Sequence, residues 1–357
     1  MTPIRNFRLA LDSEEEAAVL GALRSGELAV GADIEAFEHE LARETGVAAA
    51  AAVSSGFAAL HLALVALGVG DGDEVIMPCV STCAAIRDAA RAAGAIPVFA
   101  DTNRDDLNID PASVRECITP RTRAIISPHH LGIISDIDAL KDHSVPVIED
   151  CAQAVGVAFR GRPVGSLGTL SIFSFYATKL LTSIDGGAVA GDPDLLATVR
   201  DRRYYGGHWD DTPRFNYKMQ NAGAALGRVQ LRKLHASNER RNAIGATYAS
   251  ALTDCGAPAR TMLHRDAEGV RYRFGFRVRA DRRAAVREAL EQAGVPSRPE
   301  VGFLTADTTR FPAAAQLAAE VLTLPTYPAL TDDEVERIAS ALRRVFATQE
   351  NWIPSCA

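Results

Sequence analysis

The hydrophobic positions in the first part of the chain alternate between short apolar runs and longer segments in which apolar residues recur at helical spacing. The short runs predict β-strands at residues 47–53, 74–77, 96–100, 123–127, 145–148, 170–175 and 188–190. The spaced segments predict helices at residues 13–25, 33–44, 57–67, 82–93, 137–143 and 193–203. Strands that alternate with helices are typical of a mostly parallel sheet with helices on both faces. We therefore expect an α/β fold.

The pattern changes after a long helix predicted over residues 222–252, which is rich in alanine and arginine. Beyond it the chain predicts a smaller α+β unit, with a strand at 272–278 and helices at 282–293, 313–321 and 332–347. A chain of 357 residues is long enough for two hydrophobic cores. We therefore expect two domains: a large one over residues 1–235, which includes the N-terminal segment, and a small one over residues 236–357.

Polar residues directly follow several predicted strands. Ser55, Asp101, His129 and Asp150 stand at such positions, and Lys179 follows a later strand. The carboxyl ends of parallel strands form the edge of a sheet at which ligands collect. Burying the charge of a carboxylate or a lysine at the end of a strand costs free energy, unless the charge is paired or takes part in binding or catalysis. A pyridoxal 5'-phosphate (PLP) site would use both, with the lysine as Schiff base and the acid on the pyridinium nitrogen.

Three further stretches each have a functional and an ordinary interpretation. The turn Ser54-Ser55-Gly56 joins a predicted strand to a predicted helix, and the free N–H groups of such a helix start suit a phosphate. A plain helix cap explains the same residues. Residues 204–221 are polar, aromatic and irregular, and long loops of this kind are usually functional or lie at an interface. The pair His129-His130 has no acidic or histidine partners at ligand spacing, so we expect no metal site there.

Composition and charge narrow the function classes. Hydrophobic residues make up 47% of the chain and charged residues 23%, which is ordinary for a globular protein. The net charge of −7 and the dispersed arginines disfavour nucleic acid as a partner. No apolar run is long enough for a membrane span, so we expect no membrane association. The N-terminus lacks the pattern of a signal peptide and the six cysteines form no CxxC pair, so we expect a cytoplasmic protein with reduced thiols.

Several stretches, taken in order, resemble one protein family. They are IEAFEHELARETGV after Gly31, SSGFAALHLAL, GAIPVFAD, HHLGIISDIDAL, VIEDCAQAVG, FSFYATKLLTSIDGG, NYKMQNAGAALGRVQLRKL and LTLPTYPALTDDEVERI. Along nearly its whole length the chain resembles the PLP-dependent sugar aminotransferases of the DegT/DnrJ/EryC1/StrS type, which have the aspartate aminotransferase-like fold (fold type I). The resemblance implies a large PLP-binding domain with a mostly parallel seven-stranded sheet between helices, and a smaller α+β C-terminal domain.

The resemblance also implies roles for residues within these motifs. Lys179 would form the Schiff base with PLP and then move protons, and Asp150 would keep the pyridine nitrogen protonated. Gln153 would contact the cofactor near its O3′. The phosphate would be held by Ser55, Gly56, the N–H of Phe57, Ser174 and, from the neighbouring subunit, Asn216. A homodimer with shared active sites would explain the polar loop 204–221.

Two of these positions depart from the usual pattern of the family. Phe57 stands where a threonine or serine usually follows the glycine, so one hydroxyl contact to the phosphate is lost. Cys83 stands at the position that we assign to the aromatic residue that stacks on the pyridine ring. Further candidates, for contact with the substrate, are His129, His130 and Tyr176.

The function implied by the resemblance is amino transfer. The donor would be L-glutamate or L-glutamine, and PLP would pass through pyridoxamine phosphate as its half-reaction form. The acceptor would be a keto group of a nucleotide-linked deoxysugar or of an aminocyclitol precursor, in secondary-metabolite (such as antibiotic) or glycan biosynthesis. One alternative is a PLP-dependent sugar dehydratase, a branch in which histidine replaces the lysine, so Lys179 counts against it. Another is a non-catalytic PLP-binding regulatory protein.

Overall fold

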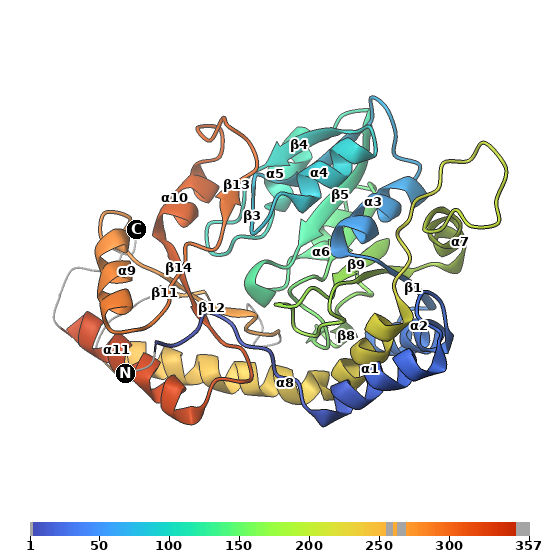
Figure 1. Ribbon diagram of the computed structural model, residues 1–357. Helices are drawn as coiled ribbons and strands as arrows, with labels where there is room; N and C mark the ends of the chain where they lie inside the picture. The colour runs from blue at the N-terminus through green and yellow to red at the C-terminus, as the bar shows by residue number, and fades with distance from the viewer. Residues whose placement is uncertain (1–2, 255–259, 263–268, 348–357) are drawn as a thin grey trace.

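The centre of the molecule is a seven-stranded sheet, and it confirms the expected α/β fold (Figure 1). The computed structural model describes residues 3–254, 260–262 and 269–347. The strands lie in the order β1 (Ala49–Val53), β10 (Gly187–Gly191), β9 (Leu170–Ser174), β6 (Val147–Asp150), β5 (Thr122–Pro128), β2 (Glu74–Pro78) and β4 (Ile96–Ala100). Strand β10 runs antiparallel to both of its neighbours, and the other pairs are parallel. The carboxyl ends of the five parallel strands therefore meet at one edge.

Both faces of this sheet are buried. Successive side chains of a strand point to opposite sides, so each strand contributes to the core on both faces. In β1, Ala52 belongs to the apolar cluster that contains Phe37, whereas Val53 belongs to the cluster that contains Leu60. The second cluster lies under α3 (Gly56–Ala66), α4 (Ala85–Ala92) and α7 (Pro193–Arg202). The first lies under α2 (Ala32–Thr45), α5 (Pro111–Cys117), α6 (Ile137–Lys141) and the first part of α8 (Asn221–Asp254).

Helix α8 is 34 residues long and runs along the base of the whole molecule (Figure 1). At one end it packs against α1 (Ser13–Ser25) and α2, and at the other against α11 (Asp332–Ala347). Near α11 a separate apolar cluster surrounds a three-stranded sheet of β11 (Arg260–Thr261), β12 (Arg273–Arg277) and β14 (Val321–Pro325), together with α9 (Arg283–Gln292). The boundary expected at residues 235/236 falls inside α8, and the division into two domains stays a prediction.

Two connections tie this C-terminal part to the edge of the large sheet. Strand β13 (Gly302–Phe303) pairs with β3 (Val80–Ser81), which directly follows β2. The helix α10 (Pro312–Glu320) begins where the backbone N–H groups of Ala313 and Ala314 donate to the carboxylate of Asp101 at the end of β4. The C-terminal part is thereby held over the carboxyl edge of the sheet, where the candidate residues gather.

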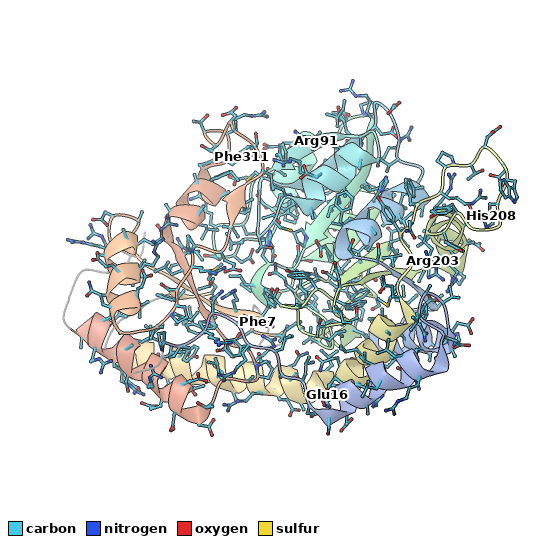
Figure 2. All side chains as sticks on the ribbon, in the orientation of Figure 1. Phe7, Glu16, Arg91, Arg203, His208 and Phe311 are labelled. Atoms are coloured by element: carbon cyan, nitrogen blue, oxygen red, sulfur yellow. The ribbon has the colours of Figure 1, made fainter. Side chains whose placement is uncertain are left out.

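The N-terminal segment crosses the same region before α1 begins. Asp12 caps α1 in a capping box with Glu15. Upstream, the Arg5 carbonyl oxygen accepts a hydrogen bond from the Tyr327 hydroxyl, at 3.0 Å. Figure 2 shows Phe7 in the middle of the molecule, above α8. The segment thus lies between the large sheet and the C-terminal part.

The structure adds elements that the hydrophobic pattern did not predict. They include helix α5 and the hairpin of β7 (Ala158–Phe159) with β8 (Arg162–Pro163). The 3₁₀ turn η1 (His130–Gly132) follows β5. Within residues 3–254, 260–262 and 269–347, every helix is too short or too polar to cross a membrane.

Candidate active site

A cavity of about 440 Å³ lies at the carboxyl edge of the sheet. It is bordered by sequence-predicted residues from five separate segments: Ser55, Gly56, Phe57, Cys83, His129, His130, Asp150, Gln153, Ser174, Tyr176 and Lys179. The N-terminal segment adds Asn6 and Phe7 to its wall, and the C-terminal part adds Tyr272, Arg273, Arg298 and Glu300. The fold therefore brings together all but one of the predicted residues, and Asn216 is the exception.

Asp150 ends strand β6 and is buried at the cavity. Within the described parts of the chain, its carboxylate accepts one hydrogen bond, from the Ala152 N–H to Oδ1 at 3.0 Å. Burial raises the pKa of Asp150, and the Ala152 N–H and the Lys179 charge offset this only in part. A cationic group in the cavity would therefore find a carboxylate that lacks a close cation.

Lys179 lies in the loop that follows β9 and is half-buried at the cavity wall. Its backbone N–H donates to the Tyr176 carbonyl oxygen at 2.9 Å, and this turn leaves the Tyr176 side chain exposed at the rim. The Lys179 ammonium lies 5.7 Å from the ring centroid of Tyr272, within cation–π range. The sequence did not single out Tyr272, because it lies in the C-terminal part, far along the chain.

The turn between β1 and α3 has the geometry of an anion cradle. Ser55 is the N-cap of α3, and its hydroxyl accepts the Ala58 N–H at 3.1 Å. A Cβ on Gly56 would lie 2.7 Å from Cβ of Ser174, so only glycine lets the two segments approach this closely. The helix-start N–H groups, which include that of Phe57, have no partner within α3 and border the cavity.

The side chain of Gln153 is fixed at both ends of its amide. Its Oε1 accepts the Leu131 N–H at 2.7 Å, and its Nε2 donates to the Thr82 hydroxyl at 2.8 Å. Thr82 was not among the predicted site residues, although it borders the cavity. The neighbouring Cys83 is exposed at the cavity rim. In this part of the wall a threonine therefore positions the glutamine.

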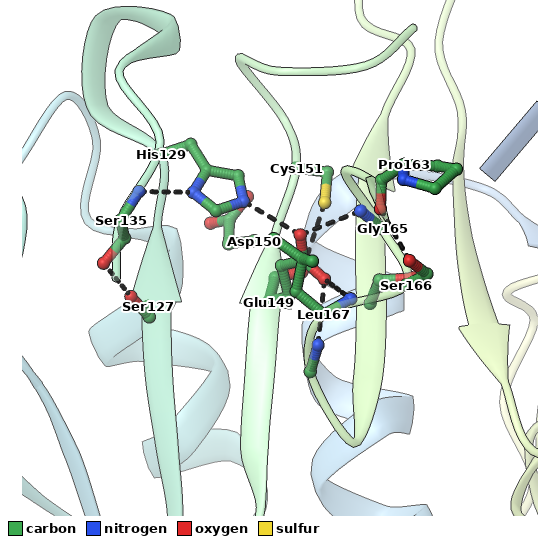
Figure 3. Close-up of polar contacts among 12 residues, drawn as sticks. Ser127, His129, Ser135, Glu149, Asp150, Cys151, Pro163, Gly165, Ser166 and Leu167 are labelled. Carbon is green, nitrogen blue, oxygen red and sulfur yellow. Dashed lines mark hydrogen bonds and ion pairs between the residues drawn. The ribbon is translucent and has the colours of Figure 1, made fainter. Parts of the chain in front are cut away.

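His129 is held from both sides of its ring (Figure 3). Nδ1 accepts the Ser135 N–H at 3.0 Å, so the ring hydrogen lies on Nε2, which donates to Glu149 at 3.1 Å. The His129 side chain is fully buried. Both ring nitrogens are thus engaged within the protein, and a substrate can meet His129 only through its other atoms.

Glu149 is a buried anchor that the sequence did not reveal (Figure 3). Besides His129, its carboxylate accepts the N–H groups of Gly165, Leu167 and Gly168, at 2.8–3.0 Å. Burial alone raises the pKa of Glu149, but these hydrogen bonds outweigh burial and lower it. Cys151 lies close enough to complete a metal-like cluster with His129 and Glu149. The hydrogen bonds that Glu149 accepts from His129 and from the loop N–H groups explain why these side chains lie close together.

His130 is also buried, but neither of its ring nitrogens has a hydrogen-bond partner among the described residues. Burial lowers the pKa of His130 to about 4, and the nearby Val80 backbone offsets this only in part. The ring is therefore neutral near pH 7. Its place beside the cavity leaves it as a candidate for contact with a ligand.

Asn216 lies outside the cavity, in an exposed loop between α7 and α8. Its Oδ1 accepts a hydrogen bond from the Lys218 ammonium at 2.7 Å. At the outer part of the same loop the Trp209 side chain is 98% exposed. A contribution of Asn216 to a cofactor site therefore requires a second copy of the chain.

The residues present fit PLP. Asp150 is a buried carboxylate that a cationic ring nitrogen would satisfy, Lys179 opens into the same cavity, and the Gly56–Ser174 approach leaves helix-start N–H groups free for a phosphate. This fold and this set of groups define the class of PLP-dependent enzymes built on a mostly parallel sheet.

The chain belongs to the DegT/DnrJ/EryC1/StrS aminotransferase family, whose model matches residues 10–343. It is similar to the putative sugar aminotransferase Spr1654 from Streptococcus pneumoniae, which was solved in PLP and PMP forms. In the PMP form the identity is 26%, the TM-score is 0.90, and 97% of this chain and 98% of that chain are covered. It is also similar to the aminotransferase TlmJ from Streptoalloteichus hindustanus, with 31% identity, a TM-score of 0.89 and 97% and 99% coverage. DesV of S. venezuelae matches with 35% identity, a TM-score of 0.86 and 94% coverage of both chains.

These matches identify the chain as a PLP-dependent aminotransferase of the sugar aminotransferase family, with pyridoxamine phosphate as the half-reaction form of the cofactor. They confirm the family and the cofactor that the sequence motifs implied.

Proposed function

We propose that the enzyme transfers the amino group of L-glutamate or L-glutamine to a keto group of a nucleotide-linked deoxysugar or of an aminocyclitol precursor. The observation that carries the proposal is the cavity into which both Lys179 and Asp150 open. The similarity to a putative sugar aminotransferase supports a sugar-like acceptor. A cavity of about 440 Å³ lies within the size range of small-molecule sites.

In this proposal each wall of the cavity holds one part of the cofactor. When bound, PLP supplies an electron-withdrawing ring that stabilises negative charge on the carbon that loses its proton. Asp150 would keep a proton on the ring nitrogen, and Gln153 would contact the cofactor beside its ring. Ser55, Ser174 and the N–H groups of Gly56 and Phe57 would hold the phosphate. Cys83, at the position that we assign to the stacking residue, would offer the ring no aromatic side chain.

In this proposal Lys179 transfers the protons at the substrate. Its amine would hold PLP covalently and, once released, would carry the proton that the donor carbon loses. Its position near the Tyr272 ring keeps the ammonium at the cavity wall. The substrate contacts that we assign to this region are Tyr176 at the exposed rim and the histidines 129 and 130 behind it.

We further propose a homodimer with shared sites, in which Asn216 reaches the phosphate of the neighbouring subunit. The exposed aromatic loop around Trp209 and the position of Asn216 outside its own cavity support this arrangement. The two domains would meet within α8. A cytoplasmic location fits the free thiols of the described cysteines.

Absorbance tests the cofactor roles. We expect purified protein with added PLP to show the visible band of a lysine-bound cofactor. The band should be lost in Lys179→Ala and kept in Lys233→Ala, since Lys233 lies outside the cavity and pairs with Glu15. A band that persists in Lys179→Ala would rule out this lysine as the attachment point.

Amino transfer from glutamate and glutamine to a panel of keto-sugars and keto-cyclitols tests the substrates. The expected result is transfer to at least one nucleotide-linked keto-sugar or keto-cyclitol. If the lysine-bound band forms but only simple keto acids accept the amino group, the proposed acceptor class is wrong while the cofactor site stands.

A further inference from the structure

Arg241 is a buried cation in helix α8, and nothing in the proposed chemistry uses it. Its side chain is 3% exposed. Its Nη1 lies 3.5 Å from the Tyr272 carbonyl oxygen, at the limit of a hydrogen bond, and its Nε has no hydrogen-bond partner in the part of the chain that the structure describes. Among the described residues, no carboxylate forms an ion pair with it. A guanidinium in this setting is costly unless a ligand satisfies it.

Two other arginines of the C-terminal part are paired. Arg277 donates twice to Glu320, at 2.6 and 2.8 Å. Arg273, beside Arg241, forms an ion pair with Glu300 at 2.9 Å. Burial lowers the pKa of Arg241 to about 10, which still leaves the group charged near pH 7. Since Glu300 compensates Arg273, Arg241 adds an uncompensated positive charge at this end of the active site.

The arginine borders a small cavity of about 20 Å³. A space of this size holds roughly one water-sized group, such as a single carboxylate oxygen. The small cavity shares part of its wall with the large one, namely Asn6, Phe7, Thr178, Tyr272 and Arg273. An anion bound at the edge of the large cavity therefore lies next to the site of Arg241.

The arginine is also linked closely to the reacting amine. Tyr272 contacts Arg241 through its carbonyl group and Lys179 through its ring. Thr178, which precedes Lys179, borders both cavities. In an α-amino acid, one carbon separates the amino nitrogen from the carboxylate. The phosphates of a sugar nucleotide lie beyond the sugar ring, farther from the keto group that reacts.

We propose that Arg241 binds the α-carboxylate of the amino-acid donor, with one carboxylate oxygen in the small cavity. The inference rests on the proposed amino transfer and names a residue that selects the donor. It explains why a cation is kept buried without a protein partner, because the partner arrives with each donor molecule. Charge-assisted hydrogen bonds in such a setting are strong and orient the ligand.

Variants of Arg241 test the proposal through the donor half-reaction, followed as the loss of the lysine-bound absorbance band. We expect Arg241→Met to reduce kcat/KM for glutamate by about 10- to 100-fold, mainly through KM. The kcat/KM of Arg241→Lys should lie between those of wild type and Arg241→Met, because lysine keeps the charge but lacks the planar guanidinium group. Arg240→Met is the matched control: Arg240 is the preceding residue of α8, it pairs with Asp332, and it borders neither cavity.

Direct binding separates ligand recognition from a structural role. Glutarate has the carboxylates of the donor without its amine, and its affinity for the PLP-loaded enzyme should fall about tenfold or more in Arg241→Met. Inorganic pyrophosphate should bind both proteins alike. Without ligand, the Tm of Arg241→Met should be unchanged or higher, because the variant removes an unpaired buried charge. If Arg241→Met does not fold, Arg241→Lys provides the same comparison.

Three results would overturn the proposal: unchanged glutarate binding, a loss of pyrophosphate binding instead, or a lower Tm with glutarate binding intact. The last would show that Arg241 only supports the Tyr272 backbone. The proposed function and the donor subsite can fail independently of each other. If no keto-sugar or keto-cyclitol accepts an amino group but glutarate binding depends on Arg241, the acceptor assignment fails and the donor subsite stands.

Discussion

At the scale of single residues, neighbouring acids at the end of β6 have opposite pKa shifts. Both Glu149 and Asp150 are buried. The pKa of Glu149 is lowered because four donors surround its carboxylate. Burial raises the pKa of Asp150, and the one hydrogen bond that its carboxylate accepts from the described residues offsets this only in part. The first is a satisfied anchor, and the second awaits a cation. The same contrast separates His129, which has both ring nitrogens engaged, from His130, whose ring nitrogens have no partner within the described segments.

The buried His130 predicts an acid sensitivity. Its pKa is about 4 in the folded protein and about 6.5 in the unfolded chain. Between these values the unfolded chain binds more protons, so stability falls as pH drops from 6.5 to 4, by about 3 kcal/mol for this one group. We expect His130→Leu to remove this part of the pH dependence, measured as the free energy of unfolding in urea across that range.

A control uses His208, which lies in the exposed loop between α7 and α8. His208→Leu should leave the slope of stability against pH unchanged. If the slope of His130→Leu matches that of wild type, the buried ring is not neutral in the folded protein, and its assignment as an uncharged ligand contact fails with it.

At the scale of elements, the turn from β1 to α3 depends on close approach of three segments. A Cβ on Gly56 would meet Ser174, and a Cβ on Gly187 would lie 2.3 Å from the Ser55 carbonyl oxygen. The cap by Ser55 and the glycines together keep the start of α3 open towards the cavity. The phosphate cradle is therefore a property of β1, β9 and β10 as a group.

We expect Gly56→Ala to weaken PLP binding by about tenfold or more, because the backbone must shift to relieve the contact with Ser174. Equilibrium dialysis of the cofactor measures this. Gly21→Ala, in α1, is the control, since a Cβ there meets nothing within 4 Å. It should leave PLP affinity unchanged and raise helix stability by about 1 kcal/mol. Equal PLP affinity of the two variants would contradict the cradle.

The loop 165–168 should depend on Glu149 in the same way. Glu149→Gln replaces an acceptor by an amide that faces N–H donors, so we expect it to lower the free energy of unfolding at pH 7 by about 3 kcal/mol. The pKa of Glu149 is lowered from 4.5, so its stabilisation is present above about pH 4.5 and lost as pH falls below it. The difference between wild type and variant should shrink accordingly.

The exposed Glu14 provides a comparison for that experiment. Glu14→Gln should change stability by no more than about 0.5 kcal/mol at pH 7, as is usual for surface sites. A cost for Glu149→Gln no larger than that of Glu14→Gln would show that the anchor is dispensable.

At the scale of the whole molecule, the active site needs parts that are distant in sequence. The N-terminal segment, the sheet edge and the C-terminal part each supply wall residues of one cavity, and α8 runs beneath all of them (Figure 1). The loop with Trp209 and Asn216 points away from this cavity, and Figure 2 shows His208 at its outer end. A site completed by a second subunit follows from this arrangement as a proposal.

Mixed dimers test it. Lys179→Ala and Asn216→Asp should each be inactive alone, the second because a carboxylate repels the phosphate. In a mixed dimer, one site would combine the intact lysine of one subunit with the intact asparagine of the other. Random mixing should then restore about a quarter of wild-type activity, since half of the dimers are mixed and each has one good site. Absence of any recovery in a confirmed mixed dimer would falsify the shared site.

The sequence by itself determined the α/β class, most strands and helices of the large sheet, and the family. The reason is that hydrophobic spacing is a local signal and that the motifs around Lys179 and Asp150 are contiguous. The order of polar residues after strands also placed Ser55 and Asp150 at one edge before any contact was known.

Only the tertiary structure decided how those residues are held. Residues 80–81 form a strand because Gly302 and Phe303 pair with them from far along the chain. The hydrogen bonds from Gln153 to Thr82 and from Arg241 to Tyr272 join segments with no common motif. Whether a buried polar group is satisfied depends on donors and charges brought by distant segments, which local periodicity does not encode. For that reason the sequence named Asp150 and Lys179, while the anchor at Glu149 and the unpaired charge of Arg241 emerged from the folded molecule.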